Sequence, residues 1–345
     1  MTSFLERAGR WFLESGIQAA SGGVARYYRS DLGANAPVSN EITGYAVSAL
    51  VYLYEQTGDA SYRDAALRAA RFLTRTAWDP VSSTFPFEPG SNLGYFFDTG
   101  IIVRGLLAAH RMSGDDEFRE RAHEAALSLA FDFLGEGVFH PVIELPEKQP
   151  LPHEPRWSRS PGCYQLKSAL AWHDLGDEHA VKLFEAVLAY SLRTHESFLA
   201  GDQVMDRLHA YCYFLEALLA VSGRPEVLAA LSAGIANVSR LLREVAPVFE
   251  RSDVSAQLLR VRLVAHHQGT VVLDRGAAEE EAARVTAFQV ADRECRLDGG
   301  FWFGSRGGQV LPYSNPVSTA FGMQALALWG DHQKGEWSFR LEELI

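Results

Sequence analysis

Two kinds of connection alternate between the apolar helical stretches of this chain, and one kind is much shorter than the other. The short connections carry a glycine and then an aspartate, as in Gly58-Asp59, Gly114-Asp115 and Gly176-Asp177. A glycine can adopt the left-handed conformation that ends a helix, and the aspartate after it can cap the next helix. We expect Gly223-Arg224-Pro225 and Gly330-Asp331 to mark similar tight turns. If each pair of helices runs out and back, all the long connections lie on one face, where we expect the function.

The helical stretches also alternate in character. The stretches 60–76 and 116–134 are amphipathic, whereas 41–57 is apolar nearly all round, which is typical of a buried helix. Six buried inner helices and six amphipathic outer helices predict an all-α fold, an α/α toroid of six helical hairpins, with an open superhelix as the alternative. The predicted helices are 3–15, 41–57, 60–76, 98–113, 116–134, 162–175, 178–196, 203–221, 225–245, 253–268, 277–293 and 317–329.

A weak internal repeat supports the hairpins. Two segments share the same order of a glycine pair, an asparagine and an Ala-Leu pair. These are Gly22-Gly23, Asn40 and Ala49-Leu50 in the first segment, and Gly299-Gly300, Asn315 and Ala325-Leu326 in the second.

Composition predicts a single domain over residues 1–345 in the cytoplasm. The net charge of −11 argues against a nucleic-acid partner. Three cysteines suggest no disulfide framework. The N-terminal stretch lacks the apolar core of a signal peptide, and no segment reaches the roughly 18 apolar residues of a membrane span. The sequence gives no indication of the oligomeric state.

The long connections, about 16–40, 77–97, 135–161, 197–202, 245–252 and 294–316, combine basic and aromatic residues. Arginines beside six helix N-termini would favour an anionic ligand. Alternatively, these arginines pair with loop carboxylates such as Glu88, Glu154 and Asp298. Aromatic rings with a polar rim suit the faces of sugar rings. The predicted saccharide-binding residues are Arg26, Tyr28, Tyr45, Trp157, Arg159, Asp202, Trp302, Arg306, Tyr313 and Asn315.

Carboxylates near the starts of the predicted inner helices are the candidate catalysts, because hydrolysis of a glycosidic bond uses one carboxyl group as acid and usually a second as base or nucleophile. Asp206 ranks first. It lies about one turn inside its predicted helix, too deep to be an N-cap, and shares a face with His209. A buried ion pair, for example with Arg207 of the same turn, is the structural alternative.

Glu41 ranks second, because Ser39 or Asn40 can fill the cap position before it, and Asp98 ranks third. For Asp98, as for Asp202 and Asp253, simple N-capping is the alternative interpretation. If the reaction were an elimination or an epimerisation, the base would be a histidine or tyrosine: Tyr45, His209 or Tyr211.

No metal or cofactor is expected. Adjacent histidines such as His266-His267 diverge on a helix and are interpreted as structural. The glycines from Gly304 to Gly308 lack the Lys-Ser/Thr ending of a phosphate-binding loop, and there is no Gly-x-Ser-x-Gly nucleophile motif.

Several segments together resemble the six-hairpin glycosidase superfamily and the helical domain of glucuronyl epimerases. They are Gly22 to Tyr28, Asn40 to Tyr45, Thr57-Gly58-Asp59 with the Ala-rich helix after it, and Asp298 to Trp302. The resemblance implies a carbohydrate-active site at the centre of the long-loop face. In unsaturated-uronyl hydrolases, which this chain resembles, an aspartate at the start of an inner helix acts as acid and base; Asp98 or Asp206 could match it.

The predicted function is therefore a glycoside hydrolase acting on an acidic, uronic-acid-containing saccharide. A uronyl lyase or epimerase is one alternative. A non-catalytic toroid that binds a glycan or a protein is the other.

Overall fold

A computed structural model describes residues 4–135, 139–154 and 156–345. The first residue of the predicted helix 3–15 and part of the predicted connection 135–161 lie outside these ranges. The described residues form two compact units. Unit 1 comprises Met1–Ile17, Tyr27–Asn35 and His195–Ile345, and unit 2 comprises Gln18–Arg26 and Ala36–Thr194. The single domain over 1–345 stays a prediction.

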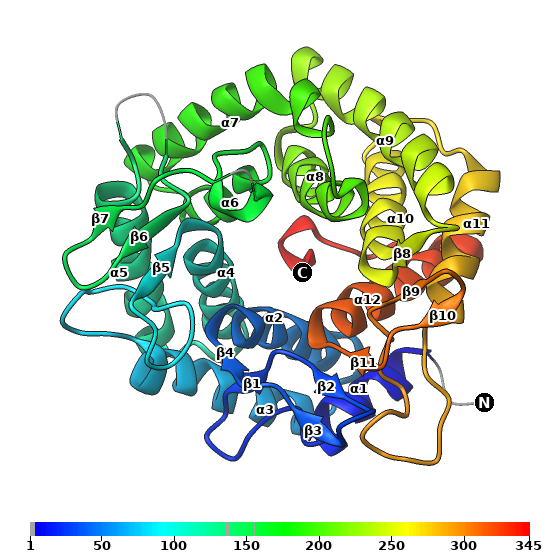
Figure 1. Cartoon of the computed structure of the whole chain (residues 1–345), viewed down its shortest axis with the longest axis horizontal. Coiled ribbons are helices and arrows are strands. Elements are labelled where there is room, and N and C mark those ends of the chain that lie inside the picture. The colour runs from blue at the N-terminus through cyan, green and yellow to red at the C-terminus, as the bar shows by residue number, and fades with distance from the viewer. Residues whose placement is uncertain (1–3, 136–138, 155) are drawn as a thin grey trace. The chain divides into compact units, whose positions relative to one another are not determined.

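Unit 2 is built on three buried helices that lie side by side, α2 (Asn40–Thr57), α4 (Phe96–Ser113) and α6 (Gln165–Leu175), as Figure 1 shows. Helices α3 (Ala60–Phe72), α5 (Asp116–Asp132) and α7 (Glu178–Phe198, whose last turn belongs to unit 1) alternate with them. Gly105 of α4 faces α2 so closely that a Cβ there would lie 2.5 Å from the Gly44 oxygen. Strands β1 (Val24–Ala25) and β4 (Val38–Ser39) pair before α2. Strand β5 (Leu93–Tyr95), just before α4, forms an antiparallel sheet with β6 (Val142–Glu144) and β7 (Gln149–Pro150) from the connection between α5 and α6.

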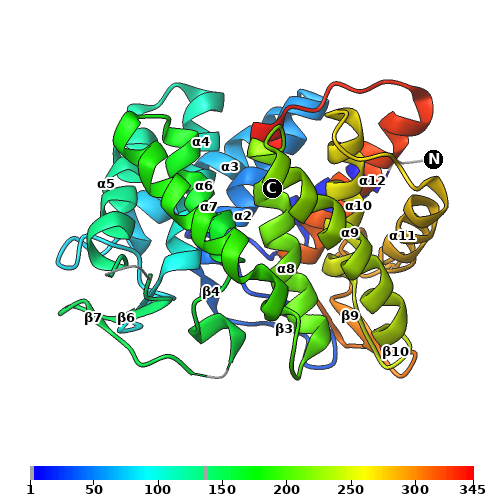
Figure 2. The same cartoon turned by 90° about the horizontal axis from the view of Figure 1, so that it is seen from above.

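Unit 1 repeats this alternation. Its buried helices are α8 (Val204–Leu218), α10 (Ser252–His267) and α12 (Pro316–Lys334), and its amphipathic ones are α1 (Phe4–Glu14), α9 (Pro225–Val245) and α11 (Arg275–Ala287). Two small antiparallel sheets occupy its long connections. One is β11 (Tyr313–Ser314), β2 (Tyr28–Arg29) and β3 (Ala34–Asn35); the other is β10 (Gln309–Val310), β9 (Gly304–Arg306) and β8 (Phe249–Arg251). Figure 2 shows β9 and β10 at the end of the unit where α10 begins.

The predicted short turns are confirmed at three hairpins. Gly58, Gly114 and Gly176 all have left-handed backbone angles, and the aspartate after each accepts a hydrogen bond from the backbone of the next helix. The predicted turn at Gly330-Asp331 is wrong, because α12 continues through these residues and ends only at Gly335, which is left-handed. Among the other ends, α11 stops at Ala287, six residues before the predicted end, and the last turn of the stretch 60–76 is a π-helix over Leu73–Ala77.

The internal repeat has a packing reason. A Cβ on Gly22 would lie 2.3 Å from the Arg68 oxygen of α3, and one on Gly299 would lie 2.1 Å from the Arg7 oxygen of α1. Both glycines have positive φ, +96° and +88°. Each glycine pair thus allows the backbone of a long connection to lie directly against the backbone of an amphipathic helix, where a side chain would not fit.

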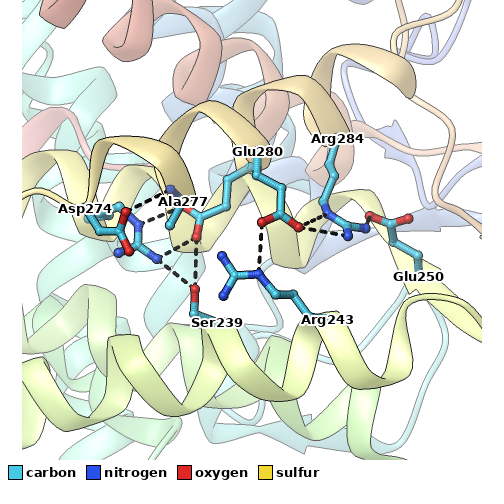
Figure 3. Close-up of polar contacts among 9 residues, drawn as sticks. Ser239, Arg243, Glu250, Asp274, Ala277, Glu280 and Arg284 are labelled. Carbon is cyan, nitrogen blue, oxygen red and sulfur yellow. Dashed lines mark hydrogen bonds and ion pairs between the residues drawn. The ribbon is translucent and has the colours of Figure 1, made fainter.

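Charged side chains of α9, α11 and β8 in unit 1 form a network of ion pairs (Figure 3). Glu280 of α11 accepts hydrogen bonds from Arg243 of α9 (2.9 Å) and from Arg284 (3.1 Å). Arg284 also donates to Glu250 of β8 at 3.0 Å. This network ties β8, the strand before α10, to both neighbouring helices.

Across the described ranges, no helix combines the length and the apolar character needed to cross a bilayer.

Candidate active site

Two carboxyl groups, those of Glu41 and Asp98, lie at the starts of the adjacent buried helices α2 and α4. Ser39 caps α2, its Oγ accepting a hydrogen bond from the backbone of Ile42, so Glu41 is the second helical residue. Asp98 is the third residue of α4, whose cap position is Tyr95. The N-capping interpretation of Asp98 is therefore wrong. Its side chain is only 8% exposed, and its Oδ2 has no hydrogen-bond partner among the described residues.

This environment favours the protonated forms of both groups. Burial raises the pKa of Glu41 to about 7, against the opposing effect of the nearby Arg26 charge. Burial also raises the pKa of Asp98 well above its usual value, and the Glu41 charge raises it further. Two carboxyls that interact in this way hold one proton between them more readily than they ionise together. At neutral pH the pair therefore offers one acid and one base.

Arg26 and Tyr95 lie beside this pair. Arg26 follows β1, pairs with Glu88 at 3.0 Å and lies over the Phe87 ring at 4.8 Å. Tyr95, the last residue of β5, packs on Phe87 with ring centroids 5.0 Å apart. Burial raises the pKa of Tyr95, and Asp98 adds to the increase. The hydroxyl of Tyr95 therefore stays a hydrogen-bond donor next to the carboxyls.

Aromatic and basic residues from the connection before α6 contact the same region. Trp157 packs edge-on against Tyr164 with centroids 5.2 Å apart, and Arg159 pairs with Glu154 at 2.7 Å. Burial raises the pKa of Tyr164 well above 10, and the Asp98 charge contributes. Tyr45, one turn beyond Glu41, is 2% exposed and belongs to the core.

The alternative interpretation of the loop arginines is confirmed at Arg26 and Arg159, which pair with Glu88 and Glu154. Both arginine side chains keep about a third of their surface exposed, 35% and 29%. The pairs weaken the argument for an anionic ligand from charge alone, so the anionic saccharide stays a prediction.

A second polar cluster lies in unit 1 around Arg251. Its Nη1 donates to Asp206 at 2.7 Å, and its Nε and Nη2 donate to Asp253 at 3.0 and 2.6 Å. Asp206 thus forms an ion pair, as the structural alternative expects, but the partner is Arg251; Arg207 instead donates to the carbonyl oxygens of Asp202 and Phe198. Burial opposes the charge of Asp253, but Arg251 lowers its pKa below the usual value.

Asp206 is the third residue of α8, closer to its start than predicted. The N-capping interpretations of two other aspartates are wrong. Asp253 lies inside α10 and binds Arg251, and Asp202 is exposed before α8, whose cap position is Gln203.

His209 contacts Gln257 and Asp253, and it interacts with Asp206 only through the charge of that carboxylate, which opposes the lowering of its pKa. Its Nδ1 lies 2.8 Å from Gln257 Oε1 and 3.6 Å from Asp253 Oδ2. Burial, assisted by the Arg251 charge, lowers the pKa of His209 to about 4, so its imidazole is neutral at pH 7.

The remaining predicted residues of unit 1 have mostly structural contacts. Tyr28 is buried, donates to Glu294 at 2.9 Å and lies under Arg296. Asn315 caps α12 by accepting from Ser318.

Three other predicted residues of unit 1 lie at the loop surface. Tyr313 stacks on Phe303 at 5.0 Å, Arg306 lies over Phe249 at 4.8 Å, and the Trp302 carbonyl accepts from Ser252.

Sequence reasoning missed Tyr95 and Tyr164 beside the carboxyl pair and the bridging role of Arg251. Tyr95 directly precedes α4 and Tyr164 directly precedes α6, whereas the predicted helices begin at residues 98 and 162, so no local signal singled out either tyrosine. Within the described ranges, no group of three or more His, Cys, Asp or Glu side chains is arranged to hold a metal ion.

No protein-family model and no curated protein matches the sequence. Solved structures do match in fold. Cellobiose 2-epimerase from Spirochaeta thermophila DSM 6192 is 17% identical, with a TM-score of 0.70 over 91% of this chain and 92% of that chain. A D-mannose isomerase is 10% identical (TM-score 0.73; 96% and 98%), and an unsaturated glucuronyl hydrolase specific for heparin is 11% identical (TM-score 0.69; 96% and 97%).

These matches confirm the predicted fold class, an all-α fold of the α/α-toroid type. They also confirm, at the level of fold, the resemblance to the six-hairpin glycosidase superfamily.

Proposed function

We propose that this chain is a carbohydrate-active enzyme, a glycoside hydrolase with Glu41 and Asp98 as its catalytic pair. The observation that carries the proposal is the pair itself, a buried carboxyl (Asp98) and a partly exposed one (Glu41) at adjacent helix starts, whose pKa values are both raised. Raised pKa values in a site with one specific charge partner are typical of acid–base catalysts. The fold matches, which are named as an epimerase, an isomerase and a hydrolase of sugars, support a saccharide as the substrate class.

The environments of the two groups assign their roles. Asp98 is more buried and is influenced by the Glu41 charge, so it keeps its proton and acts as the acid. Glu41, whose ionisation Arg26 favours, acts as the base. Asp98 protonates the glycosidic oxygen as the bond from that oxygen to the anomeric carbon breaks. Glu41 takes a proton from the water whose oxygen bonds to the same carbon.

Residues around the pair provide contacts for a sugar. The Trp157 ring can contact the face of a sugar, and Tyr95 and Arg159 can donate hydrogen bonds to its hydroxyl groups. Arg26, within range of both carboxyls, is the residue that would meet a uronate group. Uronic-acid sugars are accordingly the first substrates to test, beside neutral ones.

The test is release of reducing ends from unsaturated glucuronyl disaccharides, mannotriose and cellotriose by wild type and by Asp98→Asn. The proposal expects turnover of at least one sugar by wild type and a loss of about 100- to 10,000-fold in the variant. Asp64→Asn, which alters an exposed ion pair on α3, is the matched control and should keep full activity. Equal turnover by wild type and Asp98→Asn would contradict the proposal.

A second candidate function, epimerisation or isomerisation through proton abstraction from carbon, is favoured by one observation. His209 is neutral, and its Nδ1 faces Gln257 Oε1, which leaves Nε2 as the basic nitrogen. Incorporation of solvent deuterium into cellobiose or mannose, lost in His209→Asn and kept in Asp98→Asn, would favour this candidate over hydrolysis.

A further inference from the structure

A cavity of about 470 Å³ opens on the outward face of α5, and none of its lining residues belongs to the candidate active site. Pockets of about 300–1,000 Å³ are the usual size for small-ligand sites. Its lining includes Trp78, Arg121, Leu127, Phe131, Asp132 and Lys148.

Two apolar side chains lie exposed at this cavity. The sequence places Phe118, Ala125 and Leu129 on the buried face of α5, and all three are buried. Phe131 and Leu127 lie on the opposite face, four residues apart, and are 74% and 40% exposed. Phe131 lies on the polar face of an amphipathic helix, where the fold does not need an apolar side chain. An exposed apolar residue at such a cavity is typical of a binding surface.

The charges at the cavity cancel in pairs. Lys148 Nζ binds Asp132 at 2.7 Å, and Arg121 forms an ion pair with Glu124. Arg121 also lies over the Trp78 ring at 4.3 Å. The lining therefore presents fixed donors and acceptors without a net charge, which suits hydroxyl groups better than a carboxylate.

The backbone around the cavity is unusual as well. Among the described residues, Ser83, Lys148 and Gln203 are the non-glycine residues with positive φ. Two of them, Ser83 (46°) and Lys148 (57°), line this cavity. Non-glycine residues in such conformations cluster at ligand-binding sites.

We propose that this cavity is a second, non-catalytic saccharide-binding site for a neutral oligosaccharide. Phe131 and Leu127 contact the CH face of a sugar ring, and Arg121, Asp132 and Lys148 bind its hydroxyls. The proposal goes beyond the hydrolase function and holds whether or not the Glu41–Asp98 pair is catalytic.

The test is calorimetric titration of the full chain carrying Asp98→Asn, so that no sugar is consumed, with cellohexaose, maltohexaose, mannohexaose and trigalacturonate. At least one neutral hexaose should bind better than trigalacturonate. Adding Phe131→Ala should weaken one binding event roughly tenfold or more, as truncation of a central contact does. Since Phe131 is exposed, this change leaves the core intact. Lys148→Met, which removes one hydroxyl partner, should weaken the same event.

Val272→Ala, at another exposed apolar residue far along the sequence, is the control and should leave binding unchanged. Loss of a binding event in Phe131→Ala supports the second site even if wild type shows no turnover, so the two proposals fail separately. The proposal is overturned if no neutral hexaose binds, or if Phe131→Ala leaves every binding event unchanged. It is also overturned if Phe131→Ala changes only the oligomeric state in gel filtration, which would identify the patch as a protein interface.

Discussion

Glu41 and Asp253 occupy the same position in two different buried helices, since each is the second residue, of α2 and of α10. Their surroundings differ in one respect. Two donor atoms of Arg251 bind Asp253, which holds its pKa below the usual value, whereas burial raises the pKa of Glu41 to about 7.

Asp98 and Asp206 form a matching second relationship, because both are the third residue of their helices, α4 and α8. Arg251 binds Asp206 as well, while Asp98 Oδ2 has no partner among the described residues. The two units thus carry equivalent carboxylate pairs with different surroundings. In unit 1 the buried Arg251 neutralises Asp206 and Asp253, whereas in unit 2 Glu41 and Asp98 share a proton. We therefore place Asp98 above Asp206 as a catalytic candidate.

The first prediction concerns Arg251. Arg251→Met leaves Asp253 charged and buried without its partner, which should lower the free energy of unfolding by about 3–5 kcal/mol. Adding Asp253→Asn removes the stranded charge and should recover part of this loss. Urea unfolding of the two variants measures both effects. An Arg251→Met protein as stable as wild type would show that the cluster contributes little.

Most of the helices could be predicted, because apolar periodicity and glycine turns are local signals. The error at Gly330-Asp331 shows their limit: the dipeptide matches the turns at Gly58 and Gly114, but α12 simply continues through it. A Cβ on Gly58, Gly114 or Gly330 would meet nothing within 4 Å, so neither the dipeptide nor the space around its glycine tells where the helix ends.

The ranking of the carboxylates could not be predicted for a similar reason. Asp206 and Arg251 are 45 residues apart, and only the fold brings their side chains together. No local pattern separates an aspartate that meets an arginine from one that does not. The sequence therefore predicted the positions of Glu41, Asp98 and Asp206, but not their electrostatics.

The second prediction concerns the pH dependence of stability at Glu41. Its pKa rises from 4.5 to about 7 on folding, so the native state binds the extra proton between these values. The contribution of Glu41 to stability is complete below pH 4.5 and is lost as the pH rises through about 7. The difference in Tm, wild type minus Glu41→Gln, should therefore fall from pH 4.5 to 8. A difference that stays constant over this range would mean that Glu41 titrates normally.

His209 should show the opposite sign. Its pKa falls from 6.5 to about 4 on folding, so the unfolded state binds the extra proton between these values. Its contribution is complete above pH 6.5 and is lost as the pH falls through about 4. The Tm of wild type relative to His209→Gln should therefore fall on acidification from pH 7 to 4. NMR titration of the imidazole measures the lowered pKa of His209 directly, and a His209 that protonates near pH 6.5 would contradict the prediction.

The last prediction concerns the glycine pairs that cross the amphipathic helices. A Cβ on Gly22 would meet the Arg68 oxygen at 2.3 Å, and one on Gly299 would meet the Arg7 oxygen at 2.1 Å. Backbone atoms cannot rotate away, and both positive φ angles disfavour alanine, so Gly22→Ala and Gly299→Ala should each destabilise by about 1–3 kcal/mol. At Gly223 a Cβ meets nothing within 4 Å and φ is not positive, so Gly223→Ala should stay within about 0.5 kcal/mol of wild type. Guanidinium unfolding of the three variants makes the comparison. If Gly22→Ala and Gly299→Ala are no less stable than Gly223→Ala, the close backbone contacts do not require glycine at these positions.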